Sequence, residues 1–244
     1  MHQIAIPSHA IERALARRGR LHPFDSLDPA KTALVVVDLQ NGFMAPGQPA
    51  ETPYAREVVP EVNRLAGAAR AAGGTVVWIQ NTITPEAVQS WSVWFGDFGA
   101  GEWGPRMQRA FTPGDFGHAL YPSLDVRPGD LTVRKTRFSA FIQGASDLDA
   151  ILRGRGIDTL ITVGTATNVC CESTARDAMM LNYKVFFVSD ANACRTDEEH
   201  NATLGIMMVM FADVRSTDEM ITLLQCNAAP RPLPARPSEA RWLP

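Results

Sequence analysis

Five short apolar segments constrain the fold of this 244-residue chain most strongly. In chain order they occupy residues 33–38, 75–80, 131–135, 159–164 and 184–190. Most are continuous runs of Val, Ile, Leu and Phe rather than an alternation of apolar and polar residues. Continuous runs of this length are typical of strands that are covered on both faces of a sheet. A sixth, shorter strand is expected at residues 213–217.

Helical patterns separate these strands. Residues 145–156 carry Ser146 as a candidate N-cap, and residues 196–212 open with a Thr196–Glu199 capping box. Further helices are expected at residues 56–73 and 217–225. Strands that alternate with helices in this way favour a parallel arrangement. The sequence therefore predicts an α/β fold: a three-layer, doubly wound, mainly parallel six-stranded sheet with helices on both faces.

Two terminal regions flank this pattern, and one long insertion interrupts it. We expect an N-terminal extension at residues 1–30, one α/β domain at residues 31–226 and a Pro-rich C-terminal tail at residues 227–244. Residues 82–125 are rich in glycine and aromatic side chains and are long for a connection inside a compact domain. Such a segment is a lid, a binding loop or an oligomer contact. Its aromatic residues are Trp91, Trp94, Phe95, Phe98, Trp103, Phe111 and Phe116.

Composition excludes several classes of partner. The net charge of −3 argues against nucleic acid, and no apolar run reaches the roughly 18 residues of a membrane span. The first twenty residues lack the apolar core of a signal peptide. The four cysteines show no C-x-x-C spacing, which favours reduced thiols in a cytoplasmic protein.

Three chemically active side chains follow strands of the predicted sheet: Asp38, Lys135 and Cys170. Each has an ordinary alternative, since a lone Asp often caps a turn, a lone Lys often ends a strand in solvent and a lone Cys is often a small buried hydrophobe. Ligands of open α/β sheets bind at the carboxyl ends of the strands. The topology thus predicts a nucleophile, an acid or base and a cation at one place.

Cys170 is the better candidate nucleophile of an adjacent pair. On the helix that begins there, Cys171 shares a face with small residues suited to packing, whereas Cys170 shares its face with Ser173 and Asp177. The helix N-terminus and Lys135 are expected to lower the pKa of the Cys170 thiol. Cys194 and Cys226 have no comparable setting.

The chain resembles the isochorismatase-like cysteine hydrolases over roughly residues 31–225. The resemblance rests on VVVDLQNGF (35–43), VRKTRFSAF (133–141) and GTATNVCCESTARDA (164–178), and it is greatest for the branch of ureidoacrylate amidohydrolase and N-carbamoylsarcosine amidohydrolase. It implies a catalytic triad of Asp38, Lys135 and Cys170. It also implies a cis peptide bond at Thr165–Ala166 and an oxyanion hole made by the backbone amides of Ala166 and Cys170.

This resemblance implies a cysteine amidohydrolase that cleaves a C–N bond of a small linear amide, carbamoyl or ureido compound through a thioester. It also implies a homo-oligomer, either a dimer or a tetramer. Two alternatives stay open: an isochorismatase-type hydrolase of a different small substrate, and a non-catalytic binding protein. The presence of Cys170 argues against the first, and the complete triad argues against the second.

Substrate contacts are expected from Gln40, Asn41, Asn81, Trp91 and Arg137. Asn41 is equally explained as a turn residue, Arg137 as a surface cation and the aromatic insertion as a subunit interface. No metal or other cofactor is expected, because no histidine occurs between Asp38 and Trp78, where metal-binding relatives place one. His118 and His200 are interpreted as surface or loop residues.

Overall fold

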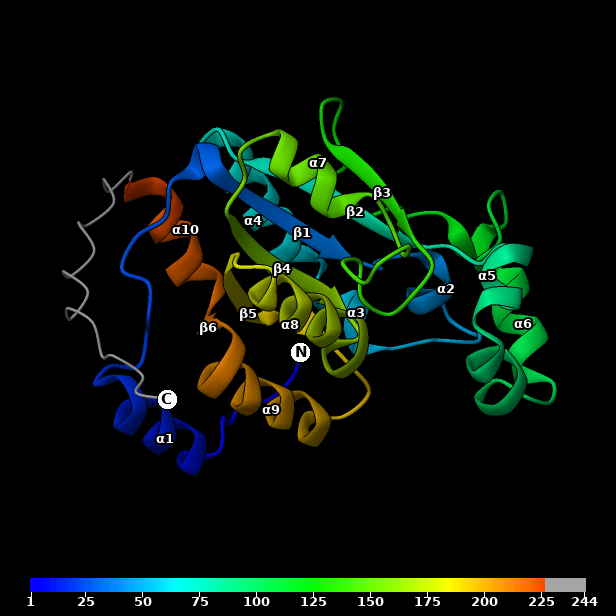
Figure 1. The fold of residues 1–244 in the computed structure, drawn as a ribbon, viewed down its shortest axis with the longest axis horizontal. Coiled ribbons are helices and arrows are strands. Elements are labelled where there is room, and N and C mark those ends of the chain that lie inside the picture. The colour runs from blue at the N-terminus through cyan, green and yellow to red at the C-terminus, as the bar shows by residue number, and fades with distance from the viewer. Residues whose placement is uncertain (227–244) are drawn as a thin grey trace, which may run out of the picture.

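Six parallel strands form the centre of the fold (Figure 1). The computed structural model describes residues 1–226, so the predicted Pro-rich tail lies outside the described residues. The strand order is β3-β2-β1-β4-β5-β6. The strands are β1 (Thr32–Val37), β2 (Thr75–Asn81), β3 (Leu131–Lys135), β4 (Thr159–Thr165), β5 (Lys184–Ala193) and β6 (Asp213–Arg215). The predicted α/β fold with a six-stranded parallel sheet is confirmed.

The central strands are buried over their whole length, as their continuous apolar sequences predict. Every residue of β1 and of β4 is buried. β1 lies between β2 and β4, with Val37 paired to Ile79 on one side and to Gly164 on the other. This register brings the carboxyl ends of three neighbouring strands to the same edge of the sheet.

Helices cover both faces of the sheet. On one face, α4 (Val59–Ala71) and α10 (Thr217–Cys226) pack on apolar side chains such as Val36 and Trp78. The other face packs against α7 (Leu148–Gly154), α8 (Glu172–Met180) and α9 (Asp197–Ile206). Burial of these two apolar layers is the main favourable contribution to folding.

Two of the predicted helices differ in the structure. The expected helix 56–73 is two helices, α3 (Tyr54–Glu57) and α4, because Pro60 near the start of α4 has no N–H to donate and sets a new helix start. The expected helix 196–212 ends as α9 at Ile206 and continues as a π-helical turn, Met207–Phe211. Thr196 caps α9 as predicted, accepting a hydrogen bond from the amide of Glu199.

The aromatic insertion forms its own small lobe beyond the carboxyl ends of the strands (Figure 1). It contains α5 (Pro85–Ser90), a π-helical turn (Val93–Phe98), α6 (Trp103–Ala110) and a 3₁₀ turn (Phe116–His118). The short helix α2 (Asn41–Met44) connects this lobe to β1, and Phe111 packs at its centre, fully buried.

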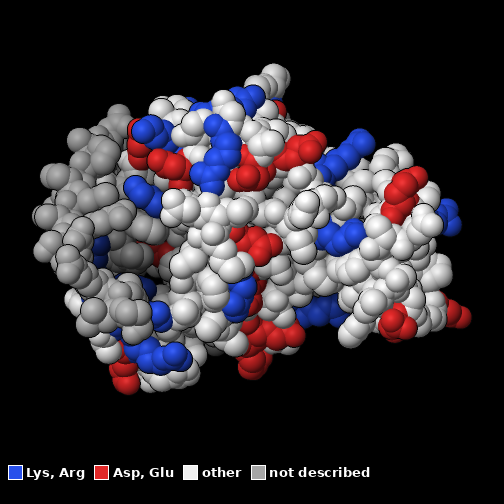
Figure 2. All heavy atoms as spheres, in the orientation of Figure 1, with Lys and Arg blue, Asp and Glu red and all other residues white. Residues whose placement is uncertain are grey.

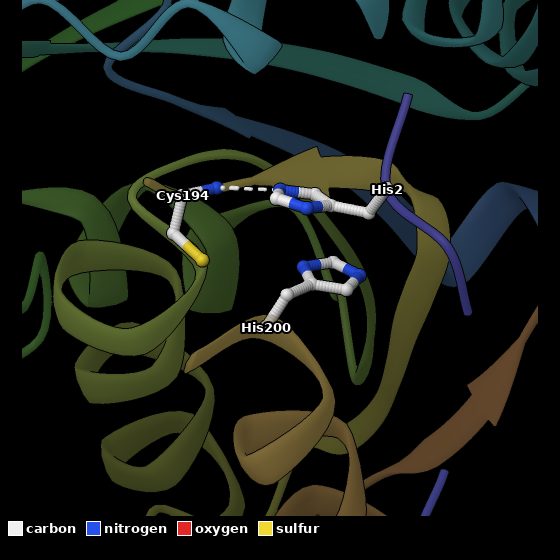
Figure 3. Close-up of side chains that lie close together, drawn as sticks. All are labelled: His2, Cys194 and His200. Atoms are coloured by element: carbon white, nitrogen blue, oxygen red, sulfur yellow. Dashed lines mark hydrogen bonds between the residues drawn. The ribbon is translucent and has the colours of Figure 1, made fainter. Parts of the chain in front are cut away.

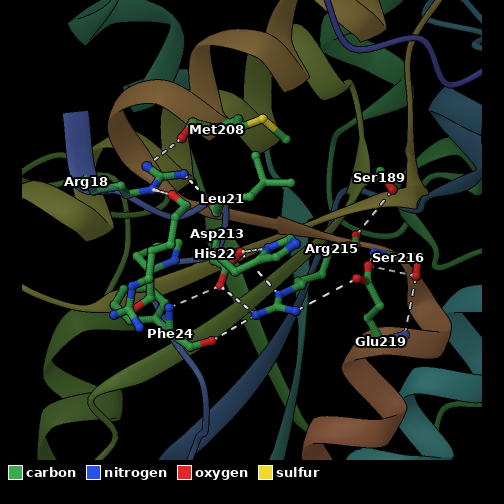
Figure 4. A network of polar contacts seen from close by, with 12 residues as sticks. Arg18, Leu21, His22, Phe24, Ser189, Met208, Asp213, Arg215, Ser216 and Glu219 are labelled. Carbon is green, nitrogen blue, oxygen red and sulfur yellow. Dashed lines mark hydrogen bonds and ion pairs between the residues drawn. The ribbon is translucent and has the colours of Figure 1, made fainter. Parts of the chain in front are cut away.

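The N-terminal segment is fixed to the rest of the fold by a polar network around Asp213 (Figure 4). The buried Asp213 carboxylate contacts His22 Nδ1 at 2.7 Å and Arg215 Nε at 3.2 Å, and it accepts a hydrogen bond from the amide of Phe24. The preceding helix, α1 (Ser8–Arg18), packs against α9 and the π-helical turn after it. This network satisfies a buried carboxylate that would otherwise be costly.

Surface properties agree with the composition. Acidic and basic side chains are intermixed on the face shown in Figure 2, with no extended field of one sign there. Within residues 1–226, no helix has both the length and the apolar character needed to cross a bilayer. The homo-oligomer, the cytoplasmic location and the domain boundaries stay predictions from the sequence.

Candidate active site

Asp38, Lys135 and Cys170 come together at the carboxyl edge of the sheet. Asp38 directly follows β1, Lys135 ends β3, and Cys170 lies in the π-helical turn Thr167–Cys171 that joins β4 to α8. Lys135 Nζ lies 2.7 Å from Asp38 Oδ2 and 3.5 Å from Cys170 Sγ. Lys135 also donates a hydrogen bond to the carbonyl of Arg137. The lysine ammonium group thus bridges the carboxylate and the thiol.

The backbone holds these groups by unusual conformations. Asp38 has a φ of 55°, in the left-handed region that side chains other than Gly, Asn and Asp seldom adopt. Gly164, with a φ of 126°, lies so close to β1 that a Cβ atom would stand 2.1 Å from the carbonyl oxygen of Val37. Only glycine fits at this point of β4. The Thr165–Ala166 peptide bond that follows is cis, as the resemblance implied.

The electrostatics of the thiol differ from the sequence prediction. Burial raises the pKa of Cys170 to about 12, and the attraction of Lys135 is partly cancelled by the neighbouring Asp38 carboxylate. The expectation of a lowered thiol pKa is therefore wrong for the ligand-free site. It failed because it counted the helix N-terminus and the lysine but not desolvation.

The other two groups form a buried ion pair. Burial raises the pKa of Asp38, although Lys135 opposes the shift. Burial lowers the pKa of Lys135, but the charges of Asp38 and Cys170 more than offset this, so the net shift is upward. At neutral pH the thiol of the resting site is therefore neutral, and Asp38 and Lys135 lie beside it as a buried pair with Oδ2 and Nζ 2.7 Å apart.

A cavity of about 320 Å³ opens onto the thiol. Cys170 and Ala166 line it, whereas Asp38 and Lys135 are fully buried behind them. Most of the wall is apolar and comes from the aromatic insertion and the segment after β3. Its lining residues include Phe43, Ile83, Trp91, Trp94, Phe95, Trp103, Met107, Phe138 and Val169. A molecule in this cavity would contact the sulfur.

Of the five predicted substrate contacts, Asn81 and Trp91 line the cavity. Gln40 does not: its amide group is taken up by backbone, since Nε2 donates to the carbonyls of Asn81 and His118 and Oε1 accepts from the amide of Asn81. Gln40 instead joins the end of β2 to the insertion. This prediction placed the residue correctly but assigned it the wrong partner.

Asn41 and Arg137 also lie outside the cavity lining. Asn41 Nδ2 donates to the carbonyl of Phe116, which ties α2 to the insertion. The Arg137 guanidinium group donates to Ser90 and Thr136 and stands over the Trp91 ring, 5.0 Å from its centroid. Both side chains therefore shape the walls rather than face a ligand.

Arg195 is a cavity residue that the sequence analysis missed. It follows β5 and contributes the charged side chain of the lining. Within residues 1–226, its guanidinium group has no hydrogen-bond or ion-pair partner. The available signal was its place just past the end of a strand, as for the other three polar candidates. An unpaired cation at a cavity wall can bind a carbonyl or carboxylate oxygen.

The two histidines that the sequence analysis interprets as surface or loop residues are both buried. His118 is 5% exposed and its Nε2 lies 2.9 Å from the Thr82 hydroxyl. His200 is fully buried, with Nδ1 at 2.9 Å from the Thr167 hydroxyl and Nε2 at 2.9 Å from the carbonyl of Ser189. Because Thr167 begins the turn that carries Cys170, its contact with His200 helps to hold that turn in place.

His200 belongs to a buried cluster with His2 and Cys194 (Figure 3). Within residues 1–226, this is the group of His, Cys and carboxylate side chains whose donor atoms are close enough to hold a metal ion. The two rings are stacked at 4.2 Å, and His2 contacts Asp197 and the amide of Cys194 through its two nitrogens. All four ring nitrogens have partners within the protein, so the cluster anchors the N-terminus.

Acid should destabilise the fold through His200. Burial, followed by the charge of His2, lowers the pKa of His200 to about 4. The folded state binds a proton on His200 less readily than the unfolded state does. The contribution of neutral His200 to the free energy of unfolding is therefore fully present above the unfolded pKa of about 6.5 and is lost as pH falls toward the folded pKa. We expect a loss of about 2–3 kcal/mol between pH 7 and about pH 4.5, measured by urea unfolding.

A His200→Gln variant should lose that part of the pH dependence, although it is less stable at pH 7. His9→Gln changes an exposed histidine and serves as the control. An unchanged difference between the two pH values in His200→Gln would contradict this assignment.

Comparison with known proteins agrees with the fold. Residues 32–219 match the isochorismatase domain family. The ureidoacrylate amidohydrolase RutB of Methylobacterium radiotolerans is 34% identical over 204 residues, which cover 76% of this chain and 76% of the relative.

Solved structures of hydrolases have the same fold as this chain. A cysteine hydrolase from Pseudomonas syringae pv. phaseolicola superposes with a TM-score of 0.73 and 26% identity, covering 86% of this chain and 99% of the other. The N-carbamoylsarcosine amidase of Thermoplasma acidophilum gives a TM-score of 0.61 and 28% identity, covering 77% of this chain and 97% of the other. The chain therefore belongs to the isochorismatase family of hydrolases.

Proposed function

We propose that this protein is a cysteine amidohydrolase that cleaves a C–N bond of a small amide, carbamoyl or ureido compound. The observation that carries the proposal is the chain of contacts from Asp38 through Lys135 to Cys170, of which Cys170 alone faces the cavity. The names of the relatives, a ureidoacrylate amidohydrolase and an N-carbamoylsarcosine amidase, support this reaction class.

The first half of the reaction begins from a neutral thiol. Asp38, which Lys135 holds beside Cys170, accepts the thiol proton as the sulfur attacks the carbonyl carbon of the substrate. Lys135 stays protonated and stabilises the negative charge that forms on sulfur. The C–N bond then breaks, and Asp38 returns the proton to the leaving nitrogen, which departs as ammonia or an amine.

The second half hydrolyses the thioester. Asp38, again a carboxylate, accepts a proton from a water molecule that attacks the thioester carbon. The C–S bond breaks, and the proton passes back to the sulfur as the acid product leaves. A single carboxylate thus acts as base and acid in both halves, and no step in this sequence uses a metal ion.

Backbone amides complete the proposed site. Ala166 and Cys170 both line the cavity, at the end of β4 and in the turn that follows it. We assign their N–H groups to the oxyanion of the tetrahedral intermediate, where one such donor is worth about 10²–10³ in kcat. Asn81 and Arg195 would hold the remaining polar atoms of the substrate.

Ammonia release from a defined panel of compounds tests this function. The panel contains ureidoacrylate, N-carbamoyl amino acids, simple primary amides and nicotinamide, with isochorismate as the probe of the alternative hydrolysis. We expect ammonia from at least one amide or ureido compound and no cleavage of isochorismate. Cleavage of isochorismate with no ammonia from any other compound would reject the proposal.

A further inference from the structure

We propose that the natural substrate carries an apolar group of about the size of an aromatic ring beside the scissile amide. This inference rests on the proposed function and specifies its substrate class. A short, fully polar ureido acid would leave most of this cavity unfilled.

The cavity wall carries the inference because it is aromatic on several sides. Six aromatic side chains line it: Phe43, Trp91, Trp94, Phe95, Trp103 and Phe138. The polar lining residues are few, chiefly Asn81, Thr136 and Arg195 besides the thiol. Cavities of at least about 300 Å³ with many apolar and few polar groups bind ligands through apolar surface and use the polar groups for orientation.

Neighbouring contacts hold the aromatic wall in place. Trp94 is its centre: its ring stacks on Trp91 at 5.6 Å and meets the edges of Phe138 at 5.0 Å and Trp103 at 5.9 Å. Offset and edge-to-face contacts at these distances are favourable arrangements of aromatic rings. The wall is therefore built before a ligand arrives, which lowers the entropic cost of binding.

Two polar anchors fix the outer members of this wall. Trp103 Nε1 donates a hydrogen bond of 3.0 Å to the carbonyl of Pro49, so its indole keeps one orientation. The Arg137 guanidinium group stands over the Trp91 ring and donates a hydrogen bond to the Ser90 hydroxyl. Because the Trp103 indole N–H is satisfied within the protein, this side chain offers the substrate an apolar ring face rather than a hydrogen-bonding group.

The wall discriminates by desolvation. An apolar ring gains free energy when it leaves water for this wall, whereas a charged or hydroxylated group loses its hydration without a partner there. Arg195 is the charged side chain of the lining and limits a substrate anion to its own side of the cavity. The reacting amide points to Cys170 and the apolar group lies toward Trp94.

Two matched pairs of compounds isolate the apolar group. Phenylacetamide is compared with acetamide, and N-carbamoylphenylalanine with N-carbamoylglycine. Within each pair the reacting group and the charge are the same, and one member adds a benzyl or phenyl group. We expect kcat/KM to be about 10- to 100-fold higher for the aromatic member of at least one pair, mainly through a lower KM.

Variants of the wall test the assigned contact. Trp94→Ala should remove most of the preference between the members of a pair, whereas Trp94→Phe, which keeps a ring, should retain most of it. Phe116→Ala is the control, since Phe116 belongs to the same insertion but is 62% exposed and does not line the cavity. It should leave the preference unchanged.

The outcomes separate this inference from the proposed function. Turnover of the small member at least as fast as that of its aromatic partner in both pairs would overturn the substrate class while the amidohydrolase function stands. A preference that survives in Trp94→Ala would overturn the assigned contact. Absence of turnover for every amide and ureido compound would reject the proposed function and, with it, this inference.

Discussion

Replacing Cys170 by alanine is expected to lower kcat/KM by about 10⁴-fold or more for every amide that the wild-type enzyme cleaves. The expectation follows from the position of the sulfur, which lines the cavity while the other two members of the triad are buried behind it. Loss of a nucleophile removes covalent catalysis entirely and leaves only binding and oxyanion stabilisation. Steady-state ammonia release measures the effect.

Cys226→Ala is the matched control, because it removes an exposed thiol at the end of α10. It should retain wild-type activity. Circular dichroism and the midpoint of urea unfolding establish that Cys170→Ala is folded. A folded Cys170→Ala variant that keeps a tenth of the wild-type rate would show that the sulfur is not the nucleophile.

Lys135→Met should destabilise the fold by about 3–5 kcal/mol at pH 7. The side chains of Lys135 and Asp38 are both fully buried, and their charged atoms are 2.7 Å apart. Removal of the ammonium group leaves a buried carboxylate without its counter-charge. The loss should be smaller near pH 4, because a protonated Asp38 carries no charge. Urea unfolding at the two pH values measures both effects.

A double variant gives the sharper result. Lys135→Met combined with Asp38→Asn removes both charges, so it should be more stable at pH 7 than Lys135→Met alone. Both variants should be inactive. If the losses of the two single variants simply add in the double variant, then the two side chains do not form the buried ion pair described here.

The sequence could predict that Asp38, Lys135 and Cys170 lie together, because a parallel sheet converts strand order into proximity. Asp38 and Cys170 are 132 positions apart in the chain, with Lys135 between them, but each of the three lies at or just after the end of a strand that could be recognised from its apolar run. The order β3-β2-β1-β4 then places these three strand ends along one edge. Neither fact requires knowledge of side-chain packing.

The features of the site that could not be predicted from the sequence depend on packing between segments that are distant in the chain. The pKa of Cys170 is set by complete burial, which a local motif does not reveal. His2 and His200 are 198 positions apart, and their stacking depends on how the N-terminal segment folds back against α9. Gln40 was expected to face a substrate, but its amide was needed to satisfy backbone groups at the end of β2. Burial and hydrogen-bond satisfaction decide such roles after the chain has folded.

The central claim is that Cys170 carries the acyl group of the substrate during turnover. A single-turnover experiment that detects this covalent intermediate tests the claim most directly. Enzyme in excess over its best substrate is quenched in acid at successive times, and its peptides are weighed by mass spectrometry. The account predicts that the peptide containing Cys170 gains and then loses the mass of the acyl group as ammonia is released. Consumption of the substrate with no peptide gaining mass at any time, or with the acyl group on another residue, would contradict it.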